Sequence, residues 1–327
     1  MKKFGIAFLC LTVTIGCKGR EAGDDRPLRV GLNIWPGYGA FLIADAKKLF
    51  AEEGVDVDIQ IIQDDPAREA ALLSGKLDGI GMTMDNLVLL NARGVKCTAI
   101  YKYDGSAGAD GIIAGAGVNA ISDLKEKRVA WASGTTSHFF LVQALKDVGL
   151  STSDLKHVDM SSDEAGAAFA SGAVEAAVTW EPWLSKAKEV EGGKVLLTTK
   201  ELPVIEDVLF MENSVLAERP DEVTRFLRAC FRAVDYWKEH PDEGNKIIAD
   251  RFDLPLKDVE GMLSGIEIMD LQKNKAFFGI GQEGASPAVL AYKSARSAWE
   301  QEGLIGAAAE PVVPAIDSSF VQRAASK

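Results

Sequence analysis

Residues 74–81 read SGKLDGIG, and residues 171–178, an offset of 97 positions, read SGAVEAAV. In both copies the Ser-Gly pair follows a helix-like stretch and precedes an apolar stretch of strand length. We therefore predict a helix that stops at Ser-Gly and a strand that starts after it, twice along the chain. Such a repeat indicates two similar α/β lobes. A Ser-Gly helix stop before a strand can also arise twice by chance, so the repeat alone does not establish a duplication.

The chain around the first copy alternates strands with helices. Apolar residues occupy every second position of the stretch after Gly54, which is the pattern of a half-buried strand. We predict strands at residues 28–34, 55–62 and 77–82, separated by helices at 40–53 and 65–73. This alternation is typical of α/β folds with parallel strands.

The second half of the chain follows the same pattern and then becomes helical. We predict a strand at 128–132, a helix at about 135–149, a returning strand at 208–211 and mostly helices beyond Pro220. The predicted organisation is lobe 1 from residues 27–112 plus 207–327, and lobe 2 from residues 113–206. Two crossings between the lobes make a hinge, and ligands bind in the cleft beyond the carboxyl ends of the strands.

The first residues indicate a targeting element. Lys2-Lys3 precede an apolar run that ends at Gly16-Cys17. The run is too short to span a membrane, and its ending resembles the bacterial lipoprotein signal, in which the cysteine carries the lipid after cleavage. We expect a signal peptide at residues 1–16, lipidation at Cys17 and a flexible lipid-anchored tether at 17–26. Plain secretion is the alternative, because Thr14 stands where an aliphatic residue is usual.

The composition excludes several classes of protein. Of 327 residues, 47% are hydrophobic and 26% are charged, as in ordinary folded proteins, and the formal net charge of −12 disfavours nucleic acid and anionic membrane surfaces. No stretch approaches the roughly 18–20 apolar residues of a membrane-spanning helix. We expect Cys97 and Cys230 to be buried free thiols, with a disulfide between them as the alternative.

Aromatic residues gather in loops that follow predicted strands. Three of the six tryptophans lie in the WPGYG loop at residues 35–39 and the WEPW loop at 180–183. Rings at the carboxyl ends of strands suit a flat ligand or a cation, so we take Trp35, Tyr38, Trp180 and Trp183 as candidate ligand contacts. The alternative is that these rings cover a local apolar patch.

Acidic residues converge on the same predicted cleft, with Glu181 between two tryptophans and the others near the crossing between the lobes. Carboxylates beside aromatic faces suit an amine, amidine or guanidinium group, because charge pairing and the ring quadrupole both favour a cation. Any one of them can instead cap a helix or lie on the surface. The acidic candidates for ligand binding are Asp85, Asp104, Asp110 and Glu181.

Residues 133–138 read SGTTSH and open a predicted helix. Exposed amides and hydroxyls at a helix N-terminus favour an anion, although an ordinary helix cap explains them equally well. A zwitterionic ligand would satisfy both this segment and the acids. The ligand-binding candidates here are Ser133, Thr135, Thr136, Ser137 and His138.

We predict no catalytic residue, no metal and no cofactor. The three histidines lack metal-ligand spacing and no Cys-x-x-Cys occurs. Ser286 misses the nucleophile-elbow pattern in its last residue. Residues 279–284 match G-x-G-x-x-G but follow no buried strand.

Four stretches, taken in order, resemble one family. They are the WPGY loop with the helix and strand that follow it, LLSGKLDGIGM, DLKEKRVAWASGTTSHFFLVQAL and VEAAVTWEPWLS, spanning residues 30–185, with a looser match at 216–230. Together they resemble the substrate-binding proteins of ABC importers, in the NMT1-like group that binds nitrate, taurine, alkanesulfonates or thiamine pyrimidine precursors.

The resemblance implies a bilobal type II periplasmic-binding fold that closes around one small ligand. It also implies a partner permease, with transmembrane subunits and a cytoplasmic ATPase. Family contacts would fall at Trp35 and Tyr38, around Asp85, at 133–138, and at Trp180 and Glu181. The ligand itself is not implied. Because the predicted cleft loops contain acids and no arginine, we favour a nitrogenous ligand over an oxyanion.

The sequence thus predicts a monomeric, lipid-anchored solute-binding protein of the periplasm or cell envelope. Its predicted ligand is a small amine, guanidinium-like or zwitterionic molecule, and its mechanism is hinge closure without chemistry. One alternative is a binder of sulfonate, taurine, nitrate or a thiamine pyrimidine precursor. The other is a pyrimidine-synthase-like enzyme on the same fold, against which the missing cysteine cluster counts.

Overall fold

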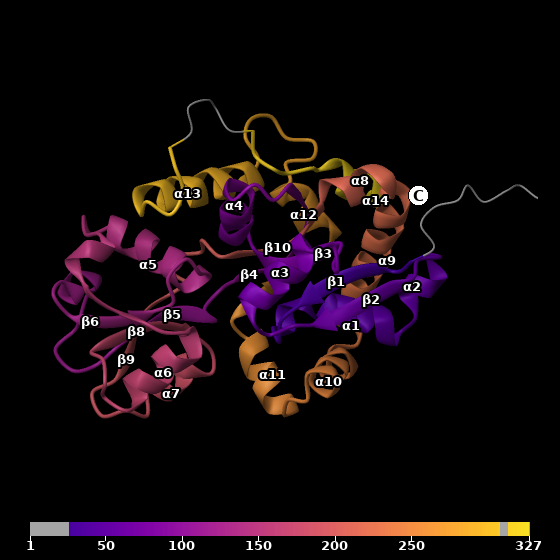
Figure 1. The fold of residues 1–327 in the computed structure, drawn as a ribbon. Helices are drawn as coiled ribbons and strands as arrows, with labels where there is room; N and C mark the ends of the chain where they lie inside the picture. Colours follow the sequence, from indigo (N-terminus) through magenta and orange to yellow (C-terminus); the bar gives the residue numbers. More distant parts are fainter. Residues whose placement is uncertain (1–25, 308–312, 327) are drawn as a thin grey trace, which may run out of the picture.

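Two β-sheets organise the protein (Figure 1). The computed structural model describes residues 26–307 and 313–326. The predicted signal peptide, the Cys17 lipidation site and the tether up to residue 25 lie outside the described residues. Sheet A has the order β11-β4-β10-β3-β1-β2, and its strands are β1 (Leu28–Leu32), β2 (Val57–Ile61), β3 (Gly79–Thr83), β4 (Cys97–Ser106), β10 (Glu206–Glu212) and β11 (Ile266–Ile268).

Sheet B has the order β7-β6-β8-β5-β9 and repeats the plan of sheet A. In sheet A the parallel strands β2, β1 and β3 are followed by antiparallel β10. In sheet B the parallel strands β7, β6 and β8 are followed by antiparallel β5. The strands of sheet B are β5 (Asp110–Ala114), β6 (Arg128–Trp131), β7 (Lys156–Asp159), β8 (Ala176–Trp180) and β9 (Lys194–Thr198).

The sequence repeat occupies equivalent places in the two sheets. Its copies lead into β3 and β8, and both strands begin five residues after the repeated serine. Ser74 and Ser171 are the C-cap residues of the preceding helices, and Gly75 and Gly172 both have positive φ, 67° and 75°. The bilobal α/β fold that the sequence predicts is therefore confirmed.

The chain passes between the sheets twice. It leaves sheet A after β4 and enters sheet B at β5, and it returns from β9 to β10. The connecting residues are 107–109 and 199–205. These passages lie within a few residues of the predicted lobe boundaries at 112 and 206, which stay a prediction.

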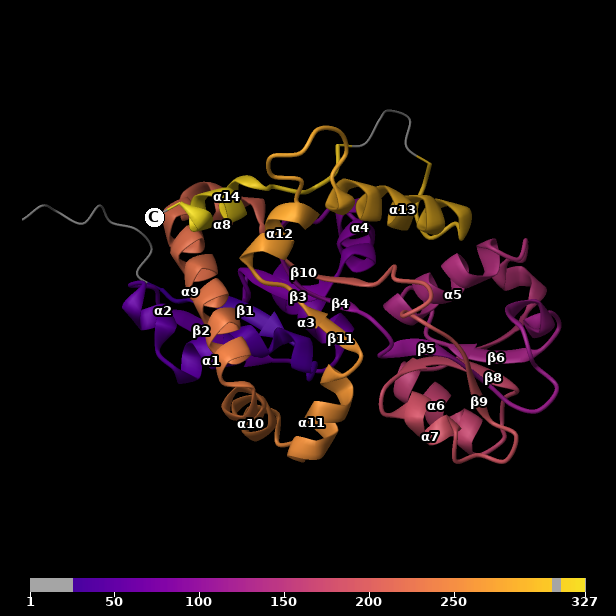
Figure 2. The same cartoon turned by 180° about the vertical axis from the view of Figure 1, so that it is seen from behind.

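Helices cover both sheets. In the first lobe two segments from opposite ends of the chain combine, and Figures 1 and 2 show the C-terminal helices packed around sheet A. The α-helices are α1 (Gly39–Ala46), α2 (Leu49–Glu52), α3 (Asp65–Leu73), α4 (Met84–Ala92), α5 (Thr136–Lys146), α6 (Ser162–Ala170), α7 (Trp183–Ala187), α8 (Asn213–Glu218), α9 (Pro220–Glu239), α10 (Pro241–Phe252), α11 (Leu256–Leu263), α12 (Leu271–Phe277), α13 (Pro287–Gln301) and α14 (Ser319–Ala325). Short 3₁₀ helices are η1 (Pro36–Tyr38), η2 (Ile121–Leu124) and η3 (Thr152–Asp154).

The predicted helix at 40–53 is wrong in one respect, because it is broken. Lys48 adopts a left-handed conformation with φ 60° and separates α1 from α2. The break redirects the chain so that Phe50 stacks on Phe226 of α9, with ring centroids 5.1 Å apart. Tertiary packing here overrides a continuous helical pattern.

Two further sequence predictions can be compared with the structure. Cys97 and Cys230 are both buried and free, as expected. Within the described residues no helix has the length and apolar character needed to cross a membrane.

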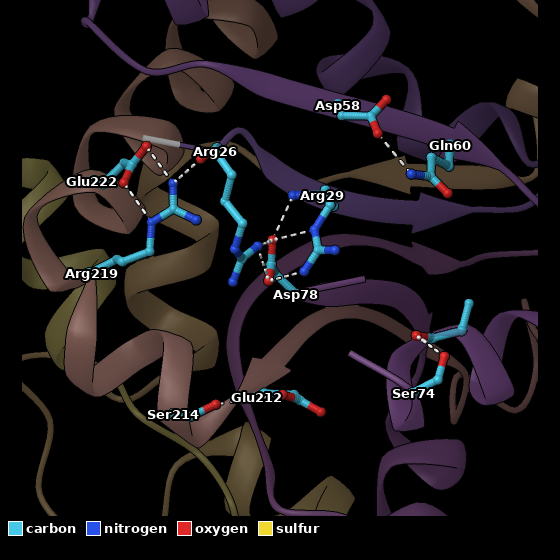
Figure 3. A network of polar contacts seen from close by, with 11 residues as sticks. Arg26, Arg29, Asp58, Gln60, Ser74, Asp78, Glu212, Ser214, Arg219 and Glu222 are labelled. Carbon is cyan, nitrogen blue, oxygen red and sulfur yellow. Dashed lines mark hydrogen bonds and ion pairs between the residues drawn. The ribbon is translucent and has the colours of Figure 1, made fainter. Parts of the chain in front are cut away.

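The amino ends of β1 and β3 are held by one buried carboxylate (Figure 3). Asp78, 2% exposed, accepts hydrogen bonds from the guanidinium groups of Arg26 and Arg29 and from the Arg29 backbone amide. Burial alone would raise the pKa of Asp78, but these hydrogen bonds outweigh it and lower the pKa. Arg219 donates to the Arg26 carbonyl oxygen and so ties α9 to the same point.

This network predicts a stability effect far from the carboxyl ends of the strands. Asp78→Asn removes the charge that two arginines share, and we expect the free energy of unfolding to fall by about 2–4 kcal/mol in urea titrations near neutral pH. Asp250→Asn is the matched control, because Asp250 is exposed and, within the described part of the chain, pairs only with Lys246 one turn away. Equal stability of the two variants would contradict the assignment.

Candidate functional site

A cavity of about 80 Å³ lies between the two sheets. It collects residues from the carboxyl ends of β1, β3 and β8, from the starts of β5, β10 and α5, and from α3 and α11. The lining residues are Asn33, Ile34, Trp35, Tyr38, Gln63, Asp65, Arg68, Met82, Thr83, Asn86, Asp110, Thr136, Trp180, Ile205, Asp207 and Met262.

The WPGY loop builds one wall of this pocket. Pro36 starts η1, and the turn brings the rings of Trp35 and Tyr38 to the cavity. The Trp35 indole donates to Asp104 at 3.2 Å, and the Tyr38 hydroxyl donates to Asp207 at 2.6 Å. Gly37 is required, since a Cβ there would lie 1.9 Å from an Asp104 oxygen. Each ring is therefore fixed by a buried carboxyl group.

Four buried carboxyl groups surround or line the pocket. Asp110 and Asp207 line it, Asp104 lies behind Trp35, and Asp85 lies in the first turn of α4. All four are at most 6% exposed. Such a concentration of carboxyl groups within a protein is costly when they are ionised.

The carboxyl groups titrate accordingly. Burial raises the pKa of Asp85 to about 7 and that of Asp110 to about 6. Burial, followed by repulsion from neighbouring carboxylates, also raises the pKa values of Asp104 and Asp207. Asp110 belongs to sheet B and Asp207 to sheet A, so the repulsion acts between the lobes.

A hydroxyl contact joins the lobes at the pocket. Thr83 at the end of β3 and Thr136 at the start of α5 share a hydrogen bond of 2.7 Å. Both hydroxyls also reach the side-chain oxygen of Asn86, at 2.5 and 3.3 Å. The structure therefore describes the two lobes in contact around a small cavity.

The predicted cleft loops contain no arginine, but helix α3 brings one to the pocket, so their composition did not show every charged group of the site. Arg68, 1% exposed, lines the pocket; it donates to the Ile62 carbonyl oxygen and to Asp65, at 2.6 and 2.5 Å. Its Nε has no hydrogen-bond partner among the described residues. Arg68 lies one turn after the start of α3. Its stem packs against β1, where a Cβ on Gly31 would lie 3.2 Å from the Arg68 Cγ.

The structure brings five of the sequence-predicted residues to the pocket and places the others near it or elsewhere. Trp35, Tyr38, Asp110, Thr136 and Trp180 line the cavity. Asp85 and Asp104 are buried beside it. The role of these seven residues as ligand contacts stays a prediction.

The remaining predicted residues make contacts within the protein. Glu181 accepts two hydrogen bonds from Ser185, and the Trp183 indole donates to Asp163. The Ser133 amide donates to Asp159, and the Thr135 hydroxyl to the Ala132 carbonyl oxygen. Ser137 shares a hydrogen bond with Ser162, and His138 Nε2 lies 3.4 Å from Glu302.

Sequence reasoning missed Asp207, Arg68 and Asn33, which line the pocket. The sequence could have pointed to Asp207. This residue directly precedes the predicted returning strand at 208–211, where the chain crosses from lobe 2 back to lobe 1. Asn33 follows β1 directly, as does the predicted Trp35 loop. No sequence pattern pointed to Arg68. In the sequence, a helix residue whose side chain faces a pocket cannot be distinguished from one whose side chain faces a strand.

Comparisons with known proteins agree with this architecture. The family model described as "NMT1/THI5 like" matches residues 35–244. A Bacillus subtilis protein named as an aliphatic sulfonates-binding protein is 31% identical over 270 residues, which are 80% of this chain and 81% of that protein.

Solved structures show the same fold at lower identity. The periplasmic aliphatic sulphonate binding protein of Escherichia coli superposes with a TM-score of 0.71 at 18% identity, over 87% of this chain and 95% of that one. The alkanesulfonate-binding protein of Xanthomonas axonopodis pv. citri, bound to MOPS, also gives 0.71, at 20% identity, over 91% of this chain and 100% of that one.

The raised pKa of Asp110 predicts a pH-dependent cost to folding. The Asp110 carboxyl group binds its proton more tightly in the folded state than in the unfolded state. The free energy of unfolding therefore falls as pH rises from about 4 to about 6 and stays lowered at higher pH. Asp110→Asn should therefore increase the free energy of unfolding of the ligand-free protein by about 1–3 kcal/mol at pH 7.5 and leave it unchanged at pH 4.

Denaturant titrations at the two pH values measure this difference. Asp45→Asn, at an exposed position, is the control and should change stability at neither pH. A loss of stability in Asp110→Asn at pH 7.5 would contradict the assignment of Asp110 as a strained carboxyl group.

Proposed function

The chain belongs to the NMT1/THI5-like family, and from this premise we propose that it captures a small solute with a cationic nitrogen group. It is a solute-binding protein of an ABC importer. One observation carries the ligand class: carboxyl groups from opposite lobes, Asp110 and Asp207, line the same small pocket. A cation between them pairs with both.

This arrangement gives a mechanism for closure. Without ligand, repulsion between Asp110 and Asp207 opposes the approach of the lobes. A bound cation replaces that repulsion with two attractions, and so it stabilises the closed state more than the open state. The rings of Trp35, Tyr38 and Trp180 add faces that favour a cation. No covalent step is needed.

A second candidate ligand carries a sulfonate group. Arg68 supports it, because this guanidinium lines the pocket and its Nε has no hydrogen-bond partner in the part of the chain that the structure describes. The names of the relatives also support it. An aminosulfonate such as taurine unites the two candidates, with its ammonium at the acids and its sulfonate near Arg68.

The proposed function includes a membrane partner, a compartment and a lipid anchor. A small molecule held by closure is delivered to permease subunits in the membrane, with an ATPase on the cytoplasmic side. We place the protein in the periplasm or cell envelope as a monomer, anchored through a lipid on Cys17. Mass spectrometry of the mature N-terminus tests the anchor: a diacylated or triacylated Cys17 supports it, and an unmodified N-terminus rejects it.

A ligand panel separates the two candidates. Protein freed of ligand by unfolding and refolding is titrated with guanidinium, methylammonium, taurine and ethanesulfonate at low millimolar concentrations. A ligand that binds only the folded state raises the melting temperature. At a ligand concentration of a hundred times its Kd, the free energy of unfolding increases by about 2.7 kcal/mol. We expect shifts with the compounds that carry a cationic nitrogen. A shift with ethanesulfonate alone would reject the cationic ligand.

The pH dependence of affinity provides an independent check. Protonation of Asp110, with its pKa raised by burial to about 6, competes with a cation. The affinity for a cationic ligand should fall about fourfold between pH 7.5 and 5.5 from this group alone, whereas the affinity for an anion should rise. Calorimetric titrations measure both directions.

Ring removal tests the pocket wall. Trp180→Ala should weaken ligand binding by about 1–3 kcal/mol, since the ring lines the cavity from lobe 2. Trp183→Ala is the control, because that indole is bonded to Asp163 and does not line the pocket. Unchanged affinity in Trp180→Ala would remove this residue from the site.

A further inference from the structure

Helix α13 connects the two lobes outside the hinge. It follows α12 in the C-terminal part of the chain and packs on α4 of the first lobe. Its other end reaches α5 of the second lobe. Figures 1 and 2 both show α13 running from α4 towards α5 along one side of the molecule.

Trp299 fills the space between α4 and α5. It is fully buried, and its indole donates to the Asp85 carbonyl oxygen of α4 at 3.0 Å. Its ring centroid lies 5.4 Å from that of His138 and 5.8 Å from that of Phe139, both in α5. One side chain therefore contacts both lobes.

Glu302, just beyond α13, holds the second lobe by polar contacts. Its Oε2 accepts from the Thr152 hydroxyl of η3 at 2.5 Å and lies 3.4 Å from His138 Nε2. The Glu302 side chain is only 10% exposed and that of His138 only 6%. Little water reaches the contact, so the charge of Glu302 interacts more strongly here than on the surface.

The same residues connect to the pocket. His138 Nδ1 accepts from the Gly134 amide at 3.1 Å, so the proton of the neutral ring is on Nε2, the atom that faces Glu302. Two residues before His138, Thr136 makes the interlobe hydrogen bond with Thr83. On the other side, Asp85, which Trp299 contacts, precedes the pocket residue Asn86.

We propose that α13 with Glu302 is a strap that holds the lobes together, and that Trp299 and Glu302 are positioning residues for the pocket. They contact no ligand themselves. By joining the first turn of α4 to the first turn of α5, they favour the arrangement in which Thr83 and Thr136 meet. The strap acts whatever the charge of the ligand.

The test uses ligand-free protein, so its failure is separate from failure of the proposed function. Glu302→Ala removes both polar contacts, whereas Glu302→Gln keeps an acceptor for Thr152. Trp299→Phe keeps a ring but loses the N–H donor to Asp85. Glu300→Gln is the control, because Glu300 lies on the same helix and pairs with Arg296 of that helix.

Small-angle X-ray scattering measures the radius of gyration of each variant, and hydrogen exchange measures the protection of its backbone amides. We expect Glu302→Ala to increase the radius of gyration and to speed exchange of the hydrogen-bonded amides 139–142 of α5 about tenfold, with α9 unchanged. Trp299→Phe and Glu302→Gln should give smaller changes, and Glu300→Gln none. Wild-type scattering and exchange in Glu302→Ala would overturn the strap. Equal acceleration in α5 and α9 would also overturn it, since that indicates global destabilisation.

Discussion

Burial of carboxyl groups from both lobes around one cavity is the constraint on which the site depends. Burial is the main cause of their raised pKa values, and repulsion from neighbouring carboxylates adds to it at Asp104 and Asp207. Asp110 from sheet B and Asp207 from sheet A line one cavity, with Asp85 and Asp104 close behind. Other side chains fix two of these groups: Tyr38 donates to Asp207, and Trp35 to Asp104. Such a site is poorly stable when empty and gains most from a partner that supplies positive charge. Strain of this kind is typical of a binding site.

The duplicated topology explains why these groups meet. In each lobe three adjacent parallel strands run towards the cleft, and the antiparallel strand beside them comes from the hinge. Asp207 and Asp110 are at the starts of those antiparallel strands, β10 and β5. Because an antiparallel strand begins where its parallel neighbours end, both carboxyl groups arrive at the edge that already holds the aromatic loops. The hinge and the site therefore share residues.

Local sequence signals were enough to predict the lobes and much of the aromatic wall. The repeat at Ser74 and Ser171 marks equivalent helix stops, and the WPGY loop follows β1 directly. Contacts between distant segments were not predictable in this way. Arg68 reaches the pocket because α3 packs on β3 with the Arg68 stem against β1, and Glu302 meets His138 because helix α13 returns from the C-terminal part of the chain to α5. Glu181 looked equivalent to Asp110 in sequence, yet its carboxylate is satisfied by Ser185.

The number of protons exchanged on ligand binding tests the central claim most directly. Calorimetric titration of the ligand-free protein with guanidinium at pH 6.5, in two buffers of different ionisation enthalpy, gives that number. Carboxyl groups that pair with a cation must be ionised, so they release the protons that they carry at this pH. The account therefore predicts binding with proton release. Absence of guanidinium binding, together with ethanesulfonate binding and proton uptake, would contradict it.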